Sequence, residues 1–116
     1  MLYSQRQPQK TRQFNLTHLY IAVDGTLATP VADGLDAKFV KSVQDLGAGN
    51  YKITFKDKAQ RNLLPVGHEV FTDGIYLRVT ATDKESVTVL CKTFACVATD
   101  ASFNLCLAFH QDKTLY

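Results

Sequence analysis

The side chains best suited to acid–base chemistry lie close together between residues 68 and 73. His68, Glu69 and Asp73 are residue types that move protons in enzyme transition states. The end of any polar hairpin carries the same types, and the sequence has no Ser-His-Asp order and no H-E-x-x-H motif. The glycines of Gly47–Gly49 fit a hairpin turn, whereas a phosphate-binding loop joins a strand to a helix. We therefore predict no catalytic residues and a protein that is not an enzyme.

Cysteine and histidine residues are too scattered to predict a metal site. The cysteines are five and ten residues apart, without a Cys-x-x-Cys motif or a nearby histidine pair. Their odd number leaves at least one thiol unpaired in a monomer. Buried free thiols that pack as small apolar side chains fit folding in a reducing cytoplasm. We predict no metal and no cofactor. The residues concerned are Cys91, Cys96, Cys106, His18, His68 and His110.

The positive charge of the chain is concentrated at its N-terminal end. The formal net charge is +2, yet residues 1–23 contain Arg6, Lys10 and Arg12 and no carboxylate. The rest of the chain is therefore close to neutral, unlike a domain with a basic stripe for phosphates. No apolar run approaches the ~20 residues of a membrane span, and the apolar stretch of a signal peptide is missing. We expect neither a nucleic acid nor a membrane as a partner.

Short alternating segments separated by turn residues predict the elements that must position any site. The composition, 46% hydrophobic and 21% charged, is that of a globular domain. We expect strands at residues 16–23, 51–56, 66–72, 75–82, 86–93 and 102–109, and a loop or short edge strand at residues 26–36. Such spacing is typical of a β-sandwich or barrel. We predict an all-β, antiparallel jelly-roll sandwich of about seven to eight strands.

Residues 35–46 fit two structures. Leu35, Phe39, Val43 and Leu46 recur at helical spacing, whereas alternation from Phe39 to Asp45 indicates a strand. A glycine-rich turn follows at residues 46–50, and a clear strand comes next. We favour a hairpin for this region.

The chain divides into an N-terminal arm and one folded domain. Residues 1–16 are rich in glutamine and basic residues and show no sustained period. We predict an extended arm over residues 1–16 and a β-sandwich over residues 17–116.

Several predicted strands carry apolar side chains on both faces. Tyr76 lies opposite the face of Leu77, Leu90 lies opposite the face of Val89, and Cys106 and Ala108 lie opposite the face of Leu105. An isolated small sandwich exposes polar residues at such positions. Scattered apolar residues are normal on protein surfaces, but three strands share the feature. We therefore expect a subunit interface.

The C-terminal two-thirds of the chain resembles small jelly-roll modules of tailed-phage structural proteins. The resemblance rests on DLGAGNYKITFKDKAQRNLLPVGHEVF, YLRVTATDKESVTVLCK and DASFNLCLAF, and covers about residues 38–109. Such modules are similar to the trimeric heads of the tumour-necrosis-factor and complement type. The resemblance implies a homotrimer with the last strand near the three-fold axis. Its trimer-interface or core residues would be Tyr76, Leu90, Phe103, Leu105, Leu107 and Phe109.

The function that the resemblance implies is that of a capsid decoration (cement) protein. A chain that begins with Met and a short arm suits a free-standing clamp better than the tip of a long fibre. We expect it on the capsid surface of the virion, made in the host cytoplasm and bound to the major capsid protein. Binding only the assembled shell would stabilise that shell by mass action. The arm residues expected to contact the capsid are Tyr3, Arg6, Lys10, Arg12 and Phe14.

The alternative is the tip of a tail or head fibre that binds a host receptor or glycan. Exposed tyrosines stack on sugars, and Asn or Asp side chains in loops bond to sugar hydroxyls. The candidates are Tyr20, Tyr51, Tyr76, Asp73 and Asn104, although each of them also suits strand packing or a turn.

Overall fold

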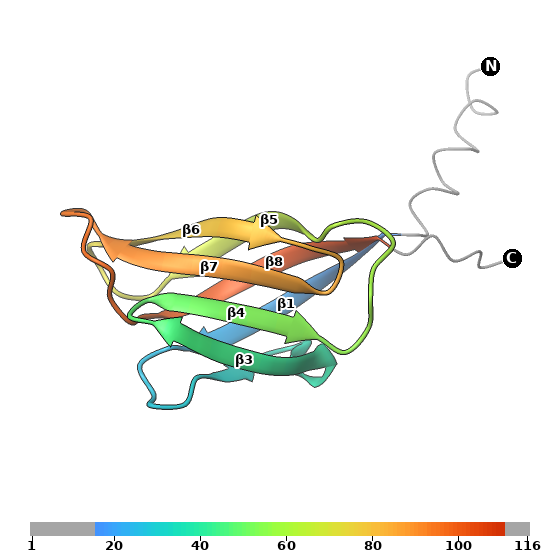
Figure 1. Cartoon of the computed structure of the whole chain (residues 1–116), viewed down its shortest axis with the longest axis horizontal. Coiled ribbons are helices and arrows are strands. Elements are labelled where there is room, and N and C mark those ends of the chain that lie inside the picture. Colours follow the sequence, from blue (N-terminus) through green and yellow to red (C-terminus); the bar gives the residue numbers. More distant parts are fainter. Residues whose placement is uncertain (1–15, 111–116) are drawn as a thin grey trace, which may run out of the picture.

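Eight β-strands follow one another along residues 16–110, the part of the chain that this computed structural model describes (Figure 1). They are β1 Leu16–Asp24, β2 Val31–Asp33, β3 Val40–Gly47, β4 Asn50–Phe55, β5 Leu64–Val70, β6 Ile75–Thr82, β7 Ser86–Thr93 and β8 Ser102–His110. A single 3-10 turn, Ala37–Phe39, precedes β3. The arm predicted at residues 1–16 lies outside the described residues, except for Leu16, where β1 begins.

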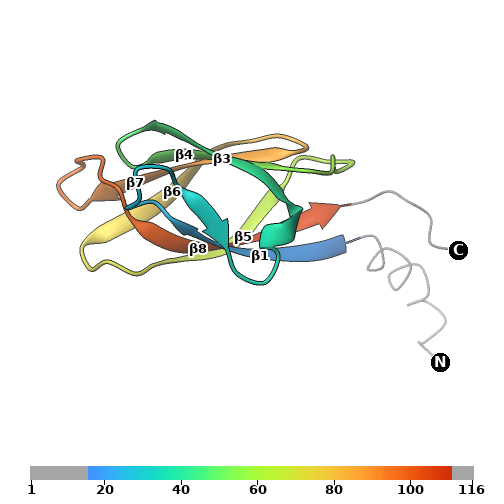
Figure 2. The same ribbon diagram turned by 90° about the horizontal axis from the view of Figure 1, so that it is seen from below.

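The strands form two antiparallel sheets that pack face to face. Sheet A has the order β2-β1-β8-β5, and sheet B has the order β3-β4-β7-β6. Figure 2 shows the two layers edge-on. The chain crosses between the layers after β2, β4, β5 and β7. The prediction of an all-β antiparallel sandwich is confirmed.

Strict alternation of side chains builds the core. In β4, Tyr51, Ile53 and Phe55 are at most 1% exposed, because successive residues of a strand point to opposite faces. The apolar residues of β8 alternate in the same way from Phe103 to Phe109 and meet the β4 side chains between the sheets. The inward faces predicted for both strands are confirmed.

The ambiguous region at residues 35–46 folds as the predicted hairpin. Only the 3-10 turn Ala37–Phe39 follows helical geometry, and Val40–Gly47 then pairs with β4. Strict alternation along residues 75–82 would place Ala81 on the same buried face as Leu77, and this expectation is wrong. Ala81 does not share the buried face of β6, because a bulge shifts the register between Val79 and Ala81 and leaves Ala81 exposed.

A buried polar network closes one end of the sandwich. The Tyr51 hydroxyl lies 2.9 Å from the Gly25 carbonyl oxygen and 2.8 Å from Asp100 Oδ1, so its one proton is shared between two acceptors. The same Asp100 oxygen accepts the Gly49 N–H at 2.8 Å. Burial, reinforced by the Asp100 carboxylate, raises the pKa of Tyr51 far above its ordinary value. Tyr51 therefore belongs to the core, and its hydroxyl is not free for the sugar contact considered from the sequence.

Two aspartates hold turns through hydrogen bonds to their carboxylates. Asp83 Oδ1 accepts the N–H groups of Glu85 and Ser86 at 2.8 and 2.7 Å, and these bonds lower the pKa of Asp83. Asp24 Oδ1 accepts bonds from Thr26 and from the Ser102 hydroxyl, which lower the pKa of Asp24. A carboxyl whose pKa is lower in the folded state stabilises the fold above its unfolded pKa.

We therefore expect the free energy of unfolding to fall as the pH drops from about 4, the ordinary pKa of an unfolded aspartate, toward the lower folded values. Urea titrations across this range measure the slope. Asp83→Asn should flatten it, whereas the control Asp73→Asn, in the turn between β5 and β6, should leave it unchanged. An equal slope in all three proteins would contradict the assignment.

Candidate functional site

A shallow groove of about 370 Å³ crosses the outer face of sheet A. Two rows of paired residues form its floor across β1, β8 and β5. One row is Tyr20–Cys106–Gly67, and the other is Ala22–Asn104–Glu69. Small side chains in the floor make the hollow. The lining residues are Tyr20, Ile21, Ala22, Gly34, Leu35, Gly67, His68, Glu69, Asn104, Leu105 and Cys106.

The loop that follows β2 forms one wall of the groove and is anchored to β1. Asp36 N–H donates to the Tyr20 carbonyl at 3.0 Å, and the Tyr20 N–H donates to Asp36 Oδ2 at 2.7 Å. Gly34 adopts a φ of 96°, a left-handed conformation that glycine reaches without strain. This anchoring carries Leu35, which is 78% exposed, to the edge of the groove.

Tyr20 and Cys106 are paired neighbours on the groove floor. The nearby Cys106 thiol raises the pKa of the Tyr20 hydroxyl, because two groups that both become negative at high pH oppose each other. The Tyr20 hydroxyl therefore stays protonated near pH 7. Tyr20 is 51% exposed, so its ring is accessible from solution.

The three acid–base side chains considered from the sequence do not meet in this groove. His68 and Glu69 both line it, but Asp73 is not among the lining residues. Glu69 pairs with Asn104 on the outer row, whereas His68 pairs with Leu105, whose side chain points into the core. The imidazole and the carboxylate therefore leave β5 on opposite faces.

The cysteines occupy three different environments and are free. Cys91 is buried, Cys96 is exposed, and Cys106 is half-buried. Burial raises the pKa of the Cys91 thiol to about 11, so it stays protonated and unreactive near neutral pH. Across residues 16–110, no group of three or more His, Cys, Asp or Glu side chains could hold a metal ion. The same stretch contains no helix long and apolar enough to cross a membrane.

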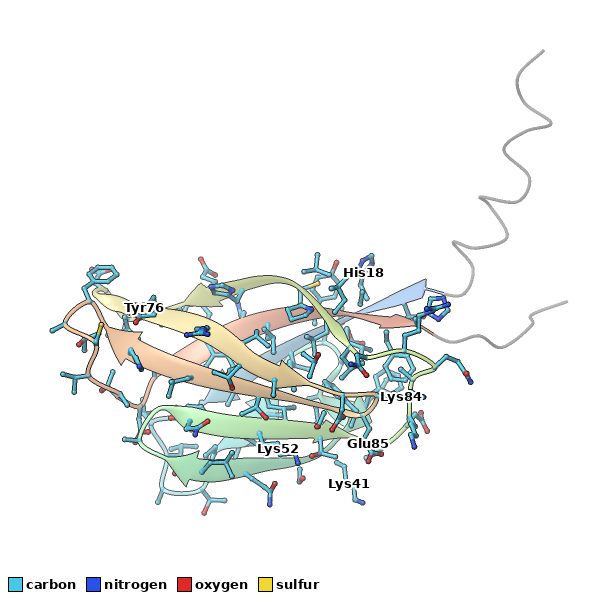
Figure 3. The ribbon with its side chains drawn as sticks, turned by 45° about the horizontal axis from the view of Figure 1, so that its top comes forward. His18, Lys41, Lys52, Tyr76, Lys84 and Glu85 are labelled. Atoms are coloured by element: carbon cyan, nitrogen blue, oxygen red, sulfur yellow. The ribbon has the colours of Figure 1, made fainter. Side chains whose placement is uncertain are left out.

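The residues predicted for a trimer interface or core separate into two groups. Phe103, Leu105, Leu107 and Phe109 are at most 5% exposed and pack between the sheets. Tyr76 and Leu90 are half-buried on the outer face of sheet B, where Figure 3 labels Tyr76. The Tyr76 ring stacks on Phe94, with centroids 6.2 Å apart. The two groups therefore cannot contribute to one continuous surface.

The predicted capsid-contact and sugar-binding residues lie in different parts of the chain. The arm residues Tyr3, Arg6, Lys10, Arg12 and Phe14 lie outside the described residues. Of the sugar-binding candidates, Tyr20 and Asn104 meet in the groove, whereas Tyr76 lies on the opposite sheet. Leu35 and Gly67 line the groove but were not predicted as site residues, because their place there depends on how distant strands pair.

The outer faces of the two sheets differ in charge. Within the described residues, the strands of sheet A contain no lysine or arginine, and their carboxylates are Asp24, Asp33 and Glu69. The strands of sheet B carry all four strand cations, namely Lys41, Lys52, Arg78 and Lys92. Figure 3 shows two of them, Lys41 and Lys52, on that sheet. The face without cations is the one that carries the groove.

Comparisons with protein-family models, with curated proteins and with solved structures found no match for the chain.

Proposed function

We propose that the chain is a phage virion structural protein, a decoration protein that binds the assembled capsid as a homotrimer. The observation that carries the proposal is the outer face of sheet A, which is free of cations and exposes Tyr20 and Leu35 together with Leu64. Large apolar side chains exposed on one face of a sheet suggest an interface between proteins. The resemblance to phage jelly-roll modules supplies the biological context.

Jelly-roll topology and the arm belong to this proposal. Strands β1 and β8 pair over nine positions in the middle of sheet A, and the chain crosses between the sheets four times. A long first-to-last pairing and repeated crossings are features that a jelly roll has in common with this sandwich. Because Leu16 pairs with His110, β1 begins at the end of the sandwich where β8 ends. An arm over residues 1–15 would extend from that end toward the shell.

The expected assembly is three copies that meet through sheet A. Native mass spectrometry should give a particle of three times the 12.9 kDa chain mass. Tyr20→Arg should reduce the particle to a monomer, because burial of the guanidinium at the interface carries a large desolvation cost. The matched control is Tyr76→Arg on sheet B, which should keep the trimer. A natural chain that is monomeric and does not bind capsids would overturn the proposal.

Capsid binding tests the second part of the function. Shells of the phage that encodes the chain should sediment with the natural protein and resist disassembly. Removal of residues 1–15 should weaken this binding, since the arm residues Tyr3, Arg6, Lys10, Arg12 and Phe14 are its proposed contacts. Full affinity of the shortened trimer would exclude the arm as a contact.

A fibre tip that binds a glycan is the second candidate, and one observation favours it. Tyr20, Glu69 and Asn104 share the groove, so an aromatic ring, a carboxylate and an amide face one hollow. Such a set can stack on a sugar and bond to its hydroxyls. Binding of the purified protein to a glycan array, lost in Tyr20→Ala, would favour this function over decoration.

A further inference from the structure

A second hollow lies at the end of the sandwich where β1 begins and β8 ends. This hollow, which we name the end slot, has a volume of about 240 Å³. Both sheets line it, and its residues are Thr17, Leu19, Asp36, Phe39, Phe55, Asp57 and Phe109. An apolar cavity of about 150 Å³ holds a benzene ring. The end slot is therefore large enough for one aromatic side chain.

The mouth of the end slot is incompletely covered. Phe55 and Phe109 are 1% and 5% exposed, but Phe39 is 37% exposed. The Lys38 ammonium group lies 5.3 Å from the centre of the Phe39 ring and covers part of it. An aromatic ring that enters the slot would remove Phe39 from water and gain the favourable contacts of an aromatic cluster.

The charges of the lining select a cationic segment. Asp36 and Asp57 are the charged groups among the lining residues, although Lys38 lies at the mouth. Asp36 Oδ2 accepts the Tyr20 N–H at 2.7 Å, which fixes that carboxylate and leaves its other oxygen available. A segment that brings both an aromatic ring and a positive charge matches the slot.

Residues 1–15 have this composition and join the body beside the slot. They contain three cations and no carboxylate. Phe14 comes three residues before Thr17, which lines the slot, so their Cα atoms lie at most about 11 Å apart. The other terminal segment, residues 111–116, joins at the same end, but its Asp112 offsets its Lys113. Charge therefore favours the N-terminal segment.

We propose that Phe14 of the same chain occupies the end slot, with Arg12 near the carboxylates of its rim. Since β1 would direct residue 14 toward the outer face if it continued, the chain must turn before Leu16. The slot and its occupant belong to one chain, so this proposal stands apart from the capsid function. If the protein decorates a capsid, Phe14 would have to leave the end slot before it could contact the shell.

The chain contains no tryptophan, so one introduced at residue 14 is a unique fluorescent reporter. In Phe14→Trp, we expect emission at shorter wavelength and weaker quenching by acrylamide than in the matched control Tyr3→Trp. Asp57→Lys, added to Phe14→Trp, should shift the emission toward that of the control. Asp73→Lys, in the turn between β5 and β6, should leave it unchanged. The shift should not depend on protein concentration.

Two further measurements keep the proposal testable if tryptophan does not fit the slot. In the natural chain, nuclear Overhauser contacts should join the Phe14 ring to the rings of Phe55 and Phe109. Phe14→Ala should lower Tm by about 5–10 °C, the shift expected when a domain of this size loses one buried aromatic contact. Absence of these ring contacts would overturn the proposal. An emission shift seen only at high protein concentration would also overturn it, because it would mean that the segment is exchanged between copies.

Discussion

Alanine at Gly49 is expected to destabilise the fold by about 2–5 kcal/mol. Gly49 has a φ of 68°, where a residue with a Cβ costs about 1–2 kcal/mol. A Cβ there would also overlap the Cys91 carbonyl oxygen and come within 2.5 Å of the Thr99 carbonyl oxygen. Both obstacles are backbone atoms, so no side chain can move aside, and overpacking adds about 1–3 kcal/mol.

Gly49 also takes part in the hydrogen-bond network around Tyr51 through its N–H and its carbonyl group. Gly49 N–H donates to Asp100, and the Gly49 carbonyl accepts the Cys91 N–H at 2.8 Å. Any shift of the turn that accommodates a Cβ would lengthen both bonds and disturb the Asp100 contact with Tyr51. The strain at residue 49 would therefore spread to the segment that connects β7 with β8.

Gly74→Ala is the matched control for this substitution. Gly74 has a similar φ of 81°, but a Cβ there meets nothing within 4 Å. It should lose only the backbone contribution of about 1–2 kcal/mol. Urea unfolding of both variants measures the difference. Equal losses would mean that the close approach to Cys91 and Thr99 does not constrain the turn.

Sequence patterns predicted the features of this fold that depend on interactions between residues close in the chain. The period of two in residues 51–55 requires only that one face of a strand be buried, and β4 follows it. The Asp83 turn follows a local rule of the same kind, because an aspartate side chain can bond to backbone N–H groups two and three residues ahead. The close approach at Gly49 was not expected, since the atoms that cause it belong to residues about 42–50 positions away.

The groove shows a second limit of sequence reasoning. Its floor requires β1 and β5 to pair with opposite edges of β8, which places Tyr20 and Gly67 beside the same Cys106. No period in the sequence encodes which strands are neighbours, because pairing between distant strands is decided by how the whole sandwich packs. The two-sided strands were therefore visible as a pattern, but the sheet to which each face belongs was not.

The assignment of strands to sheets indicates which face the proposed trimer would use. Cys106 and Ala108 face outward from sheet A, whereas Tyr76 and Leu90 face outward from sheet B. The cations of the strands lie in sheet B, and a buried interface tolerates unpaired cations poorly. Association through sheet A leaves Lys52, Arg78 and Lys92 in water. This arrangement gives the lower desolvation cost and fits the groove face as the contact.

Alanine at Phe103 is expected to destabilise the chain by about 3–5 kcal/mol, the usual cost of removing a buried aromatic side chain. Phe103 is fully buried, and its ring centroid lies 5.8 Å from that of Tyr51. The cavity left behind would lie between the two sheets, where the strands cannot close together without disturbing the pairing of β8 with both β1 and β5. The loss is a large part of the 5–15 kcal/mol that stabilises a typical domain.

Tyr76→Ala separates this core role from a role in an interface. It removes a ring of similar size from the outer face of sheet B, where its stacking on Phe94 contributes about 0.5–1.5 kcal/mol. The unfolding midpoint in urea and the native mass of the particle together distinguish Phe103→Ala from Tyr76→Ala. Phe103→Ala should shift the unfolding midpoint strongly, while the folded fraction keeps the mass of the natural protein. A Phe103→Ala protein that is as stable as the natural chain but has lost its subunit association would instead place Phe103 at the interface between copies.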